Sequence, residues 1–415
     1  MHRLSLDTMQ PLAVTAFTAT SGAGLGRAAL SALLRTTSTA LRENDFTRQA
    51  MPTFIGRVLG LEDLPLPSHW QDWDCRNNRL AWLALNQDDF WAAARSAVAK
   101  HGPTRVAVLM GTSTSSVGAS EEAYTRLTAQ GHFPPDLSHP KVHSPHSLGA
   151  FVAHVLGVAG PCMTVATACS SSAKVFAQAE RLIRCGLVDA AVVGGVDSLC
   201  HSVLYGFKSL GLVSSRLCRP FDADRDGINV AEAGGFVLLE SAANDTRREA
   251  TLHLVGHGES SDAHHMSAPH PLGLGARQAM LQALSRAGMA PAKVDYINLH
   301  GTATPKNDEV EAKVVAEVFE ARTRVSSTKG WTGHALGAAG VLESVVTLLA
   351  LSEGWLPGTL NCREPDPELG DRFGHMLQRQ TTSAPISVAM SNSFGFGGNN
   401  CSLVFARTAH EALTA

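Results

Sequence analysis

Short, almost continuously apolar segments that alternate with amphipathic ones constrain the fold of this chain more than any other feature of its sequence. Residues 106–111 read VAVLMG, and residues 190–197 read AAVVGGVD after an amphipathic stretch that ends near Gly186. A strand with one solvated face alternates apolar and polar residues, whereas a strand buried on both faces is apolar throughout. The pattern therefore predicts an α/β chain whose sheet is covered by helices on both sides.

The same rhythm extends through the chain. Apolar runs predict further strands at 12–17, 163–168, 236–240, 251–258, 294–300, 385–394 and 401–405. Apolar periodicity and apolar content predict helices at 170–185, 277–287, 307–319 and 336–351. The second part of the chain repeats the rhythm of the first, but the sequence repetition is too faint to demonstrate a duplication.

Length and charge exclude several classes of function. With 415 residues, of which 44% are hydrophobic, the chain has ample material for a large core or for two fused halves. A net charge of −3 gives no electrostatic basis for binding nucleic acid or an anionic membrane. No apolar run approaches the ~20 residues of a membrane span. The eight cysteines include no C-x-x-C pair, which favours reduced thiols in a cytoplasmic protein over disulfides.

The densest group of histidines does not predict a metal site. Residues 262–271 read DAHHMSAPHP. The histidines lack the regular spacing of a helical ligand pair, and the proline and serine residues indicate a loop. We therefore predict no metal site in this chain.

Cys169 is the strongest candidate for a nucleophile. It follows the predicted strand 163–168 and comes directly before the helix predicted to begin at Ser170. The aligned N–H dipoles at a helix N-terminus favour the thiolate, which is the nucleophilic form of a cysteine. An isolated cysteine is more often an inert buried side chain, so the assignment depends on two histidine motifs downstream. With them, Cys169 is expected to accept an acyl group as a thioester.

Two histidines match this cysteine. His300 ends the predicted strand 294–300 and opens the turn GTATP. His334 lies in the glycine-rich segment KGWTGHALGAAG, five residues after Lys329. Two neutral imidazoles each donate one N–H to a single thioester oxygen, which stabilises the enolate formed when a malonyl thioester loses CO2. A single histidine is more often structural, but packing does not explain two of them in strand-exit turns rich in glycine and threonine.

A third motif, GFGGNN at residues 395–400, directly follows a predicted strand. Its glycines permit backbone angles and close approaches that other residues resist. A backbone N–H from this loop, together with the N–H of Cys169, would form an oxyanion hole. The alternative is an ordinary tight turn between two strands.

Together these motifs resemble those of the β-ketoacyl-acyl carrier protein synthases, the condensing enzymes of the thiolase superfamily. The resemblance covers roughly residues 104–405 and includes CRPFDADRDG at 218–227, DAHHMSAPHP at 262–271 and MSNSFGFGGNN at 390–400. Two active-site histidines resemble the elongating branch, since the initiating branch has a histidine and an asparagine. A thiolase would need a second catalytic cysteine in a C-x-G motif, and none occurs near the C-terminus.

The resemblance implies a thiolase-like fold, in which two similar halves form five layers in the order αβαβα, and a dimer of such chains. Residues 1–250 would form the half that carries the nucleophile, and residues 251–415 the half that carries both histidines. It also implies substrates carried on the phosphopantetheine of an acyl carrier protein, with no cofactor on the enzyme itself. A homodimer and a heterodimer with a chain-length-factor-like ketosynthase both remain open.

Residue by residue, the resemblance implies that Cys169 is the acyl-accepting nucleophile and that His300 and His334 serve decarboxylation and condensation. Lys329 would support the protonation and position of the histidines, and Glu343 matches the family's supporting acid. Some family members hold a monovalent cation, at positions that correspond here to Asn298, Glu343 and Ser391.

The resemblance also assigns residues around the substrate. Phe396 matches the aromatic residue that gates the acyl pocket, and its N–H matches the second oxyanion donor. Phe394 and Gly397 flank it in the same loop. Thr302 and Thr304 match positions that contact the pantetheine arm.

Three departures from the common family pattern concern the substrate and partner rather than the reaction. Residues 227–235 read GINVAEAGG, Asn399 replaces the usual threonine of the terminal loop, and His264 stands where a tyrosine is usual. These features resemble ketosynthases of dedicated secondary pathways, such as aryl-polyene assembly, in which the active subunit pairs with a cysteine-less chain-length partner. Two alternatives are a non-catalytic chain-length subunit, against which Cys169 argues, and a degradative thiolase, which would use coenzyme A as acyl acceptor.

Overall fold

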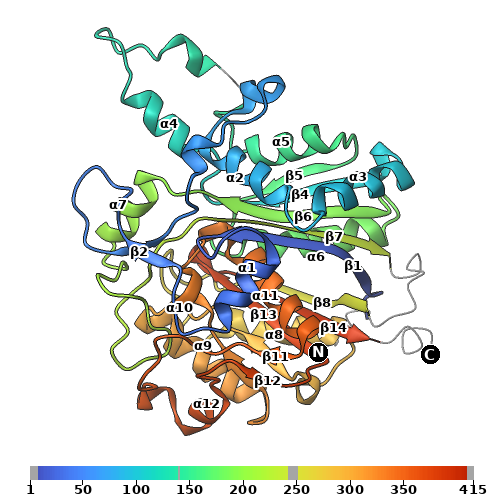
Figure 1. Ribbon diagram of the computed structural model, residues 1–415. Coiled ribbons are helices and arrows are strands. Elements are labelled where there is room, and N and C mark those ends of the chain that lie inside the picture. Colours follow the sequence, from blue (N-terminus) through green and yellow to red (C-terminus); the bar gives the residue numbers. More distant parts are fainter. Residues whose placement is uncertain (1–7, 139–140, 242–250, 409–415) are drawn as a thin grey trace.

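The computed structural model describes residues 8–138, 141–241 and 251–408 (Figure 1). Ten strands form one mixed sheet in the spatial order β10-β9-β13-β14-β8-β1-β7-β6-β4-β5. Five of them belong to the first part of the chain: β1 (Leu12–Ser21), β4 (Val106–Gly111), β5 (Cys162–Val165), β6 (Ala190–Asp197) and β7 (Ala233–Ser241). Five belong to the second: β8 (Thr251–Ser261), β9 (Tyr296–Asn298), β10 (Arg324–Ser326), β13 (Val388–Gly395) and β14 (Asn399–Thr408). Two small sheets pair β2 (Leu41–Glu43) with β3 (Phe54–Gly56) and β11 (Trp355–Leu356) with β12 (Thr382–Ser383).

The two halves of the large sheet have the same topology. In each half the order, from the outer edge to the centre, is the third strand along the chain, then the second, fourth, fifth and first. In each, the second strand pairs in parallel with the third and the fourth. The fifth pairs antiparallel with the fourth and the first. This shared order and direction shows the internal duplication that the sequence repetition was too faint to demonstrate.

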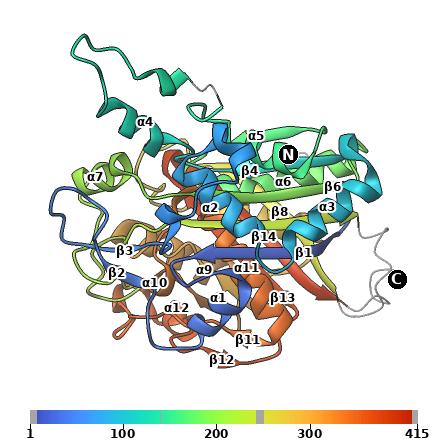
Figure 2. The ribbon, with the colours of Figure 1, turned by 45° about the horizontal axis from the view of Figure 1, so that its top comes forward.

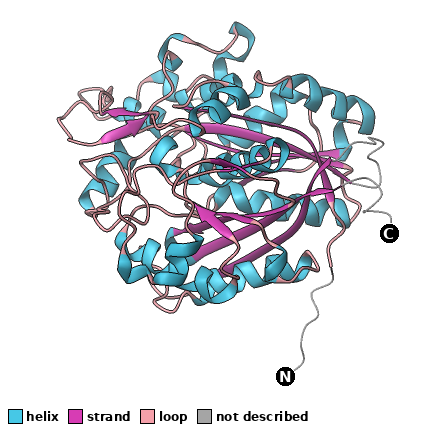
Figure 3. Cartoon of the chain, turned by 60° about the horizontal axis from the view of Figure 1, so that its bottom comes forward, coloured by secondary structure: helices cyan, strands magenta, loops and turns pink. Residues whose placement is uncertain are grey.

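Helices cover both faces of each half, which gives five layers (Figures 1 and 2). The central layer consists of α6 (Ser171–Arg184) and α11 (Ala339–Glu353), which contact strands of both halves. The outer layer of the first half holds α2 (Arg76–Leu85), α3 (Phe90–His101) and α5 (Ser147–Leu156), and that of the second holds α8 (Leu274–Arg286) and α9 (Pro305–Val318). In Figure 3 the strands lie between these helices. The predicted α/β fold with two similar halves in the order αβαβα is confirmed.

Shorter helices complete the chain: α1 (Gly26–Leu34), α4 (Val117–Tyr124), α7 (His201–Ser209), α10 (Lys329–Thr332) and α12 (Asp371–Met376). Three apolar clusters fill the spaces between the layers, one around the central helices and one on the outer side of each half. The stretch Leu336–Glu353 is long and apolar enough to cross a membrane, yet 89% of it is buried within the fold. This segment is a core helix, because both halves of the sheet pack against it.

Most predicted elements are present, with shifted ends. Strands β4 and β6 have the predicted bounds, and the helix predicted at 170–185 is α6. Two differences concern the predicted site. Strand β5 ends already at Val165, and β9 covers only Tyr296–Asn298, so His300 lies in the loop after the strand. The predicted helices do not include α2, α3 or α5. The division of the chain after residue 250 stays a prediction.

The packing of α8 on β8 generates a stability prediction. A Cβ added at Gly258 would lie 1.9 Å from the carbonyl oxygen of Ala279. We predict that Gly258→Ala lowers the free energy of unfolding by about 1–3 kcal/mol, because the strand and the helix must move apart. Urea unfolding of the variant and of the wild-type protein measures the difference.

Gly206→Ala in α7 is the matched control. No atom lies within 4 Å of a Cβ added there. Alanine also favours the helical backbone, so this variant should be as stable as the wild-type protein or slightly more stable. Equal stability of the two alanine variants would contradict the packing argument.

Candidate active site

Cys169 lies in a sharp turn between β5 and α6. Ala168 before it has a φ of 51°, a left-handed conformation that residues other than glycine rarely adopt. The Ser171 hydroxyl holds the turn, since its Oγ accepts the N–H of Thr167 at 2.8 Å and donates to the Ala168 carbonyl at 2.6 Å. The turn places Cys169 two residues before the start of α6, and this residue is only 5% exposed.

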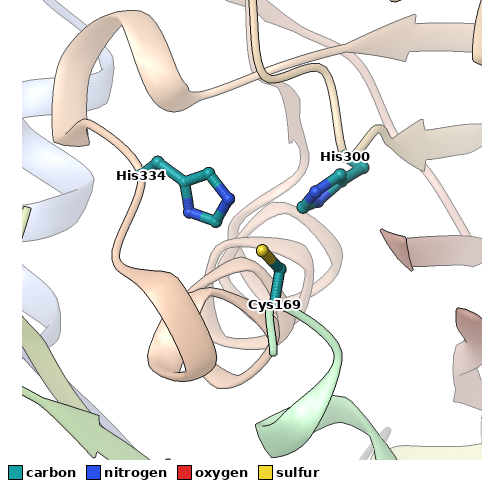
Figure 4. A group of neighbouring side chains, drawn as sticks. All are labelled: Cys169, His300 and His334. Carbon is teal, nitrogen blue, oxygen red and sulfur yellow. The ribbon is translucent and has the colours of Figure 1, made fainter. Parts of the chain in front are cut away.

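The structure brings both predicted histidines to this thiol (Figure 4). The Cys169 sulfur and one ring nitrogen each of His300 and His334 lie within 4.8 Å of one another. The two imidazole centroids are 5.3 Å apart, with an interplanar angle of 86°. Cys169 comes from the first half of the chain and both histidines from the second, so the site forms where the two halves meet.

Both imidazoles are neutral N–H donors. Burial, together with the nearby Lys329 ammonium, lowers the pKa of His300 and of His334 well below the ordinary value. The Nδ1 of His334 accepts the N–H of Leu336 at 3.1 Å. The Nδ1 of His300 lies 3.5 Å from the Lys329 Nζ, which only donates. Each ring therefore carries its proton on Nε2.

This protonation bears on metal binding. Cys169, His300 and His334 are close enough together to hold a metal ion. However, a histidine binds a metal through the lone pair of an unprotonated nitrogen. Because both Nδ1 atoms accept hydrogen bonds, the Nε2 atoms are donors, and the arrangement suits an oxyanion rather than a metal.

Lys329 connects the two histidine motifs. It opens α10, a short helix that precedes His334, so the prediction that His334 leaves a strand was wrong. Gly333, with a φ of 72°, redirects the chain after this helix. The Lys329 ammonium is buried, donates to the His300 carbonyl and forms an ion pair with the Glu343 carboxylate. Burial raises the pKa of Glu343 to about 7, against the opposite effect of Lys329.

Glu311 is a site residue that the sequence analysis missed. It lies on α9, and its carboxylate accepts the N–H of His300 at 2.8 Å and the N–H of Gly301 at 2.7 Å. Burial raises the pKa of Glu311 to about 7. A signal was available in the sequence: this acidic residue lies among Val310 and Val314 on the side of the helix predicted to be apolar. A carboxylate in such a place needs a partner.

The thiol is not activated in the free protein. Burial raises the pKa of Cys169 to about 11, and this effect outweighs the preference for the thiolate that the helix N-terminus was expected to give. The Lys329 ammonium and the backbone N–H groups of Phe396 and Cys169 act in the opposite direction. Removal of the sulfur from water outweighs them, because burial penalises the charged form.

The loop at residues 395–400 supplies the N–H group of Phe396. It consists of the 3₁₀ turn Phe396–Gly398 between β13 and β14. A Cβ added at Gly395 would lie 2.9 Å from the Thr167 carbonyl and 3.2 Å from the Cys169 nitrogen. A side chain at this position would therefore push the loop away from the nucleophile. As placed, the N–H groups of Phe396 and Cys169 offset part of the rise in the Cys169 pKa that burial causes.

A cavity of about 220 Å³ opens beside the three side chains. Phe394 and Phe396 line it, and the Phe394 ring centroid lies 6.2 Å from that of His300. The Phe396 ring packs 5.6 Å from Phe207 of α7. Gly397, by contrast, is exposed and lies outside this lining.

The two predicted pantetheine residues lie in the same cavity. Thr302 and Thr304 are part of its wall, and their hydroxyl oxygens are 2.8 Å apart. Apolar side chains, including Leu212 and Ile228, form another part of the wall. The cavity thus combines an apolar surface with hydroxyl groups that suit a chain bearing amides.

Several buried polar atoms have no hydrogen-bond partner in the described part of the chain, and they include Asn298 Oδ1 and Nδ2, Ser391 Oγ and Glu343 Oε2. Asn298 and Ser391 are paired across β9 and β13, and α11, which carries Glu343, packs on β13. Unpaired buried oxygens are costly, and oxygen ligands suit hard cations. These residues therefore fit the monovalent cation that the family resemblance implied.

The two raised carboxyl pKa values generate a prediction. A carboxyl whose folded pKa of about 7 exceeds the ordinary 4.5 keeps a proton that it releases on unfolding. Each such group therefore lowers the free energy of unfolding as pH rises from 4.5 to 7, by at most about 1.4 kcal/mol per pH unit. We predict that stability falls less steeply across this window in Glu343→Gln than in the wild-type protein. Urea unfolding at several pH values measures both slopes.

Glu309→Gln is the matched control, because it removes an exposed carboxylate from the helix that carries Glu311. This variant should keep the wild-type slope. An unchanged or steeper slope in Glu343→Gln would contradict the assigned direction of the Glu343 pKa shift.

Curated relatives match a large part of this chain. A mitochondrial 3-oxoacyl-acyl-carrier-protein synthase of Arabidopsis thaliana is 41% identical over 267 residues, which cover 60% of this chain and 57% of that protein. A 3-oxoacyl-acyl-carrier-protein synthase 2 of Synechocystis is 35% identical over 320 residues, which cover 72% of this chain and 74% of that protein. The matched region thus spans less than two thirds of the first relative and nearly three quarters of the second.

Solved structures have the same fold. A ketosynthase (ApeO) from Xenorhabdus doucetiae, in complex with its chain length factor (ApeC), is 37% identical, with a TM-score of 0.87 over 96% of this chain and 98% of that one. The ishigamide ketosynthase/chain length factor is 26% identical, with a TM-score of 0.83 over 97% and 100%. Residues 80–245 match the β-ketoacyl synthase N-terminal domain, and residues 252–363 match its C-terminal domain. This chain, whose Cys169, His300 and His334 lie within the matched domains, belongs to the β-ketoacyl synthase family.

Proposed function

We propose that this chain is a β-ketoacyl-acyl carrier protein synthase that elongates acyl chains by decarboxylative Claisen condensation. The observation that carries the proposal is the convergence of one thiol, two neutral imidazoles and two backbone N–H donors on one cavity. The reaction needs a nucleophile, a stabiliser of an enolate and an oxyanion hole. The thiol would be the nucleophile, the two imidazoles would stabilise the enolate, and the two backbone N–H groups would form the oxyanion hole.

Acyl loading begins when the Cys169 thiol attacks the acyl thioester of a carrier protein. The N–H groups of Cys169 and Phe396 bind the oxyanion that forms on the thioester carbonyl. The carbon–sulfur bond to pantetheine breaks, and the proton of the cysteine leaves with the pantetheine sulfur. Because the free thiol is protonated, this exchange is neutral overall and needs no thiolate stored in the resting enzyme.

Condensation follows when malonyl-carrier protein enters. The Nε2–H groups of His300 and His334 donate to the malonyl thioester oxygen, which becomes an enolate oxygen as CO2 leaves. The enolate carbon attacks the Cys169 thioester, and the cysteine sulfur departs as a thiolate that takes up one proton from solvent. Neutral donors suit this step, because they stabilise negative charge only where it develops in the reaction.

Three charged residues act through the histidines rather than on the substrate. Lys329 keeps the His300 Nδ1 in its acceptor state, and Glu343 balances the charge of Lys329. Glu311 holds the backbone of the His300 loop. A monovalent cation bound by Asn298, Ser391 and Glu343 would supply positive charge next to this network.

The substrates reach the cavity on the phosphopantetheine of an acyl carrier protein, and the enzyme itself needs no further cofactor. The hydroxyls of Thr302 and Thr304 would bond the amides of that arm, which is supported by their place in the cavity wall. All eight cysteines are free thiols, which supports a reducing, cytoplasmic location.

We further infer that the chain serves a secondary pathway of the aryl-polyene type and pairs with a chain-length-factor-like ketosynthase. Support comes from its likeness to the Xenorhabdus ketosynthase that forms a complex with its chain length factor. Asn399 and His264, which depart from the common family pattern, also support this inference. Strand β5 forms an edge of the large sheet, and its Met163 is 40% exposed, which offers a surface for a partner. A homodimer through this edge is the second possibility.

Replacement of the nucleophile generates the first functional prediction. Cys169→Ala should abolish acyl loading and condensation with the fold intact, because it is the only cysteine in the cavity lining. Intact-protein mass spectrometry, after incubation with a panel of acyl carrier proteins and then malonyl-carrier protein, measures both steps. The wild-type protein should gain one acyl group and then lose it to a longer acyl carrier.

Cys162→Ala is the control, since this half-buried thiol lies on β5 outside the cavity. It should load and condense like the wild-type protein. Full activity of Cys169→Ala would overturn the assignment. A wild-type protein that gains no acyl group from any donor, and has no selectively alkylated thiol, would identify a non-catalytic subunit. Use of coenzyme A as acceptor without CO2 release would identify a thiolase.

The histidines generate a second functional prediction. His300→Ala and His334→Ala should each slow malonyl decarboxylation by about 10²–10³-fold, because each removes one donor to the enolate oxygen. Acyl loading should change much less. Release of CO2 from malonyl-carrier protein measures the first step, and mass spectrometry measures the second.

His146→Ala is the matched control, because this imidazole bonds Thr164 outside the cavity. It should leave both steps unchanged. Decarboxylation at the wild-type rate in both active-site variants would count against the proposed role of the histidines.

A further inference from the structure

A second cavity, of about 200 Å³, lies at the end of α6 opposite to Cys169. Its lining combines basic side chains with one carboxylate and consists of Glu180, Arg181 and Arg184 near the end of α6, His257 of β8, Arg286 from the last turn of α8, and Thr8 and Met9. Its walls therefore come from both halves of the chain. No step of the proposed reaction uses these residues.

Two of the three arginines in this cavity contact a carboxylate, and the third does not. Arg181 forms an ion pair with Glu259, and the Arg184 Nε donates to Glu180 at 3.0 Å. Arg286 donates to the backbone carbonyl of His257 at 2.9 Å and forms no ion pair with a carboxylate of the described residues. Burial and the positive charge of Arg181 lower the pKa of Arg286. The cavity thus contains a guanidinium whose charge is not balanced by a contact.

His257 supplies the complementary feature. It is 1% exposed, and its Nε2 lies 3.3 Å from the Glu180 carboxylate, to which it donates. The Nδ1 is then an acceptor, and this buried atom has no hydrogen-bond partner within the described ranges. The helix dipoles of α6 and α8 account for arginines in their last turns, but they do not account for an unpaired buried nitrogen.

We propose that this cavity binds a phosphate group that carries one P–OH. The charged oxygens accept hydrogen bonds from the guanidinium groups that surround the cavity, and the P–OH donates to the His257 Nδ1. Sulfate has a similar shape and no proton at neutral pH, so it lacks the second contact. Free inorganic phosphate and a phosphate monoester share this chemistry. Because the cavity walls belong to both halves, the bound group stabilises the folded chain.

Titration calorimetry of the full-length protein at neutral pH and constant ionic strength tests this proposal. The probes are inorganic phosphate, sulfate and phenyl phosphate. Phosphate should bind at a single site, with sulfate about tenfold weaker or more. Tighter binding of phenyl phosphate would assign the site to monoesters, and tighter binding of phosphate would assign it to the free ion. No binding, or equal binding of phosphate and sulfate, would show an adventitious ion only and overturn the proposal.

Matched variants locate the site. Arg286→Gln should weaken phosphate binding about tenfold or more, whereas Arg277→Gln, which removes an arginine of the same helix that pairs with Glu317, should leave it unchanged. Arg184→Gln changes a more exposed wall residue and repeats the test if Arg286→Gln does not fold. Condensation activity should persist in all three variants, so the outcome is independent of the proposed function. Wild-type phosphate affinity in both cavity variants would overturn the proposal.

Discussion

The close contact between the first turns of the two central helices is the packing constraint on which the site depends. A Cβ added at Gly340 would lie 2.6 Å from the backbone nitrogen of Ala173, and the residue after Gly340 donates its N–H to the Ser172 hydroxyl at 2.9 Å. Helices α6 and α11 approach this closely because Gly340 has no side chain. Since Cys169 precedes α6 and His334 precedes α11, this contact sets the distance between the thiol and the imidazole.

Burial decides the charge state of the site that this contact creates. It raises the pKa of Cys169 and of Glu343 and lowers the pKa of His300 and His334. The resting site therefore holds a neutral thiol and two neutral imidazoles, with Lys329 beside them as the nearest cation. Such a site stabilises negative charge that develops on a bound substrate. The Cys169 sulfur itself carries little negative charge before the reaction.

Helix α6 borders a cavity at each of its two ends. Its first turn positions the nucleophile, and its last turn borders the arginine-lined cavity. Both ends lie between the two halves of the chain, because α6 belongs to the central layer and contacts strands of each sheet half. The duplication of the sheet thus brings side chains from the two halves together around both cavities, the one beside Cys169 and the one beside His257.

The sequence by itself determined the α/β class and identified Cys169, His300 and His334, which the fold brings together, because apolar patterns and glycine-rich motifs are local properties of the chain. It did not determine the duplication, which is visible only in strand order, nor the role of Glu311, which depends on the His300 backbone nearby. It also did not determine the protonation state of the Cys169 thiol. The helix N-terminus is a local feature, whereas the burial that raises this pKa arises only when distant segments pack together.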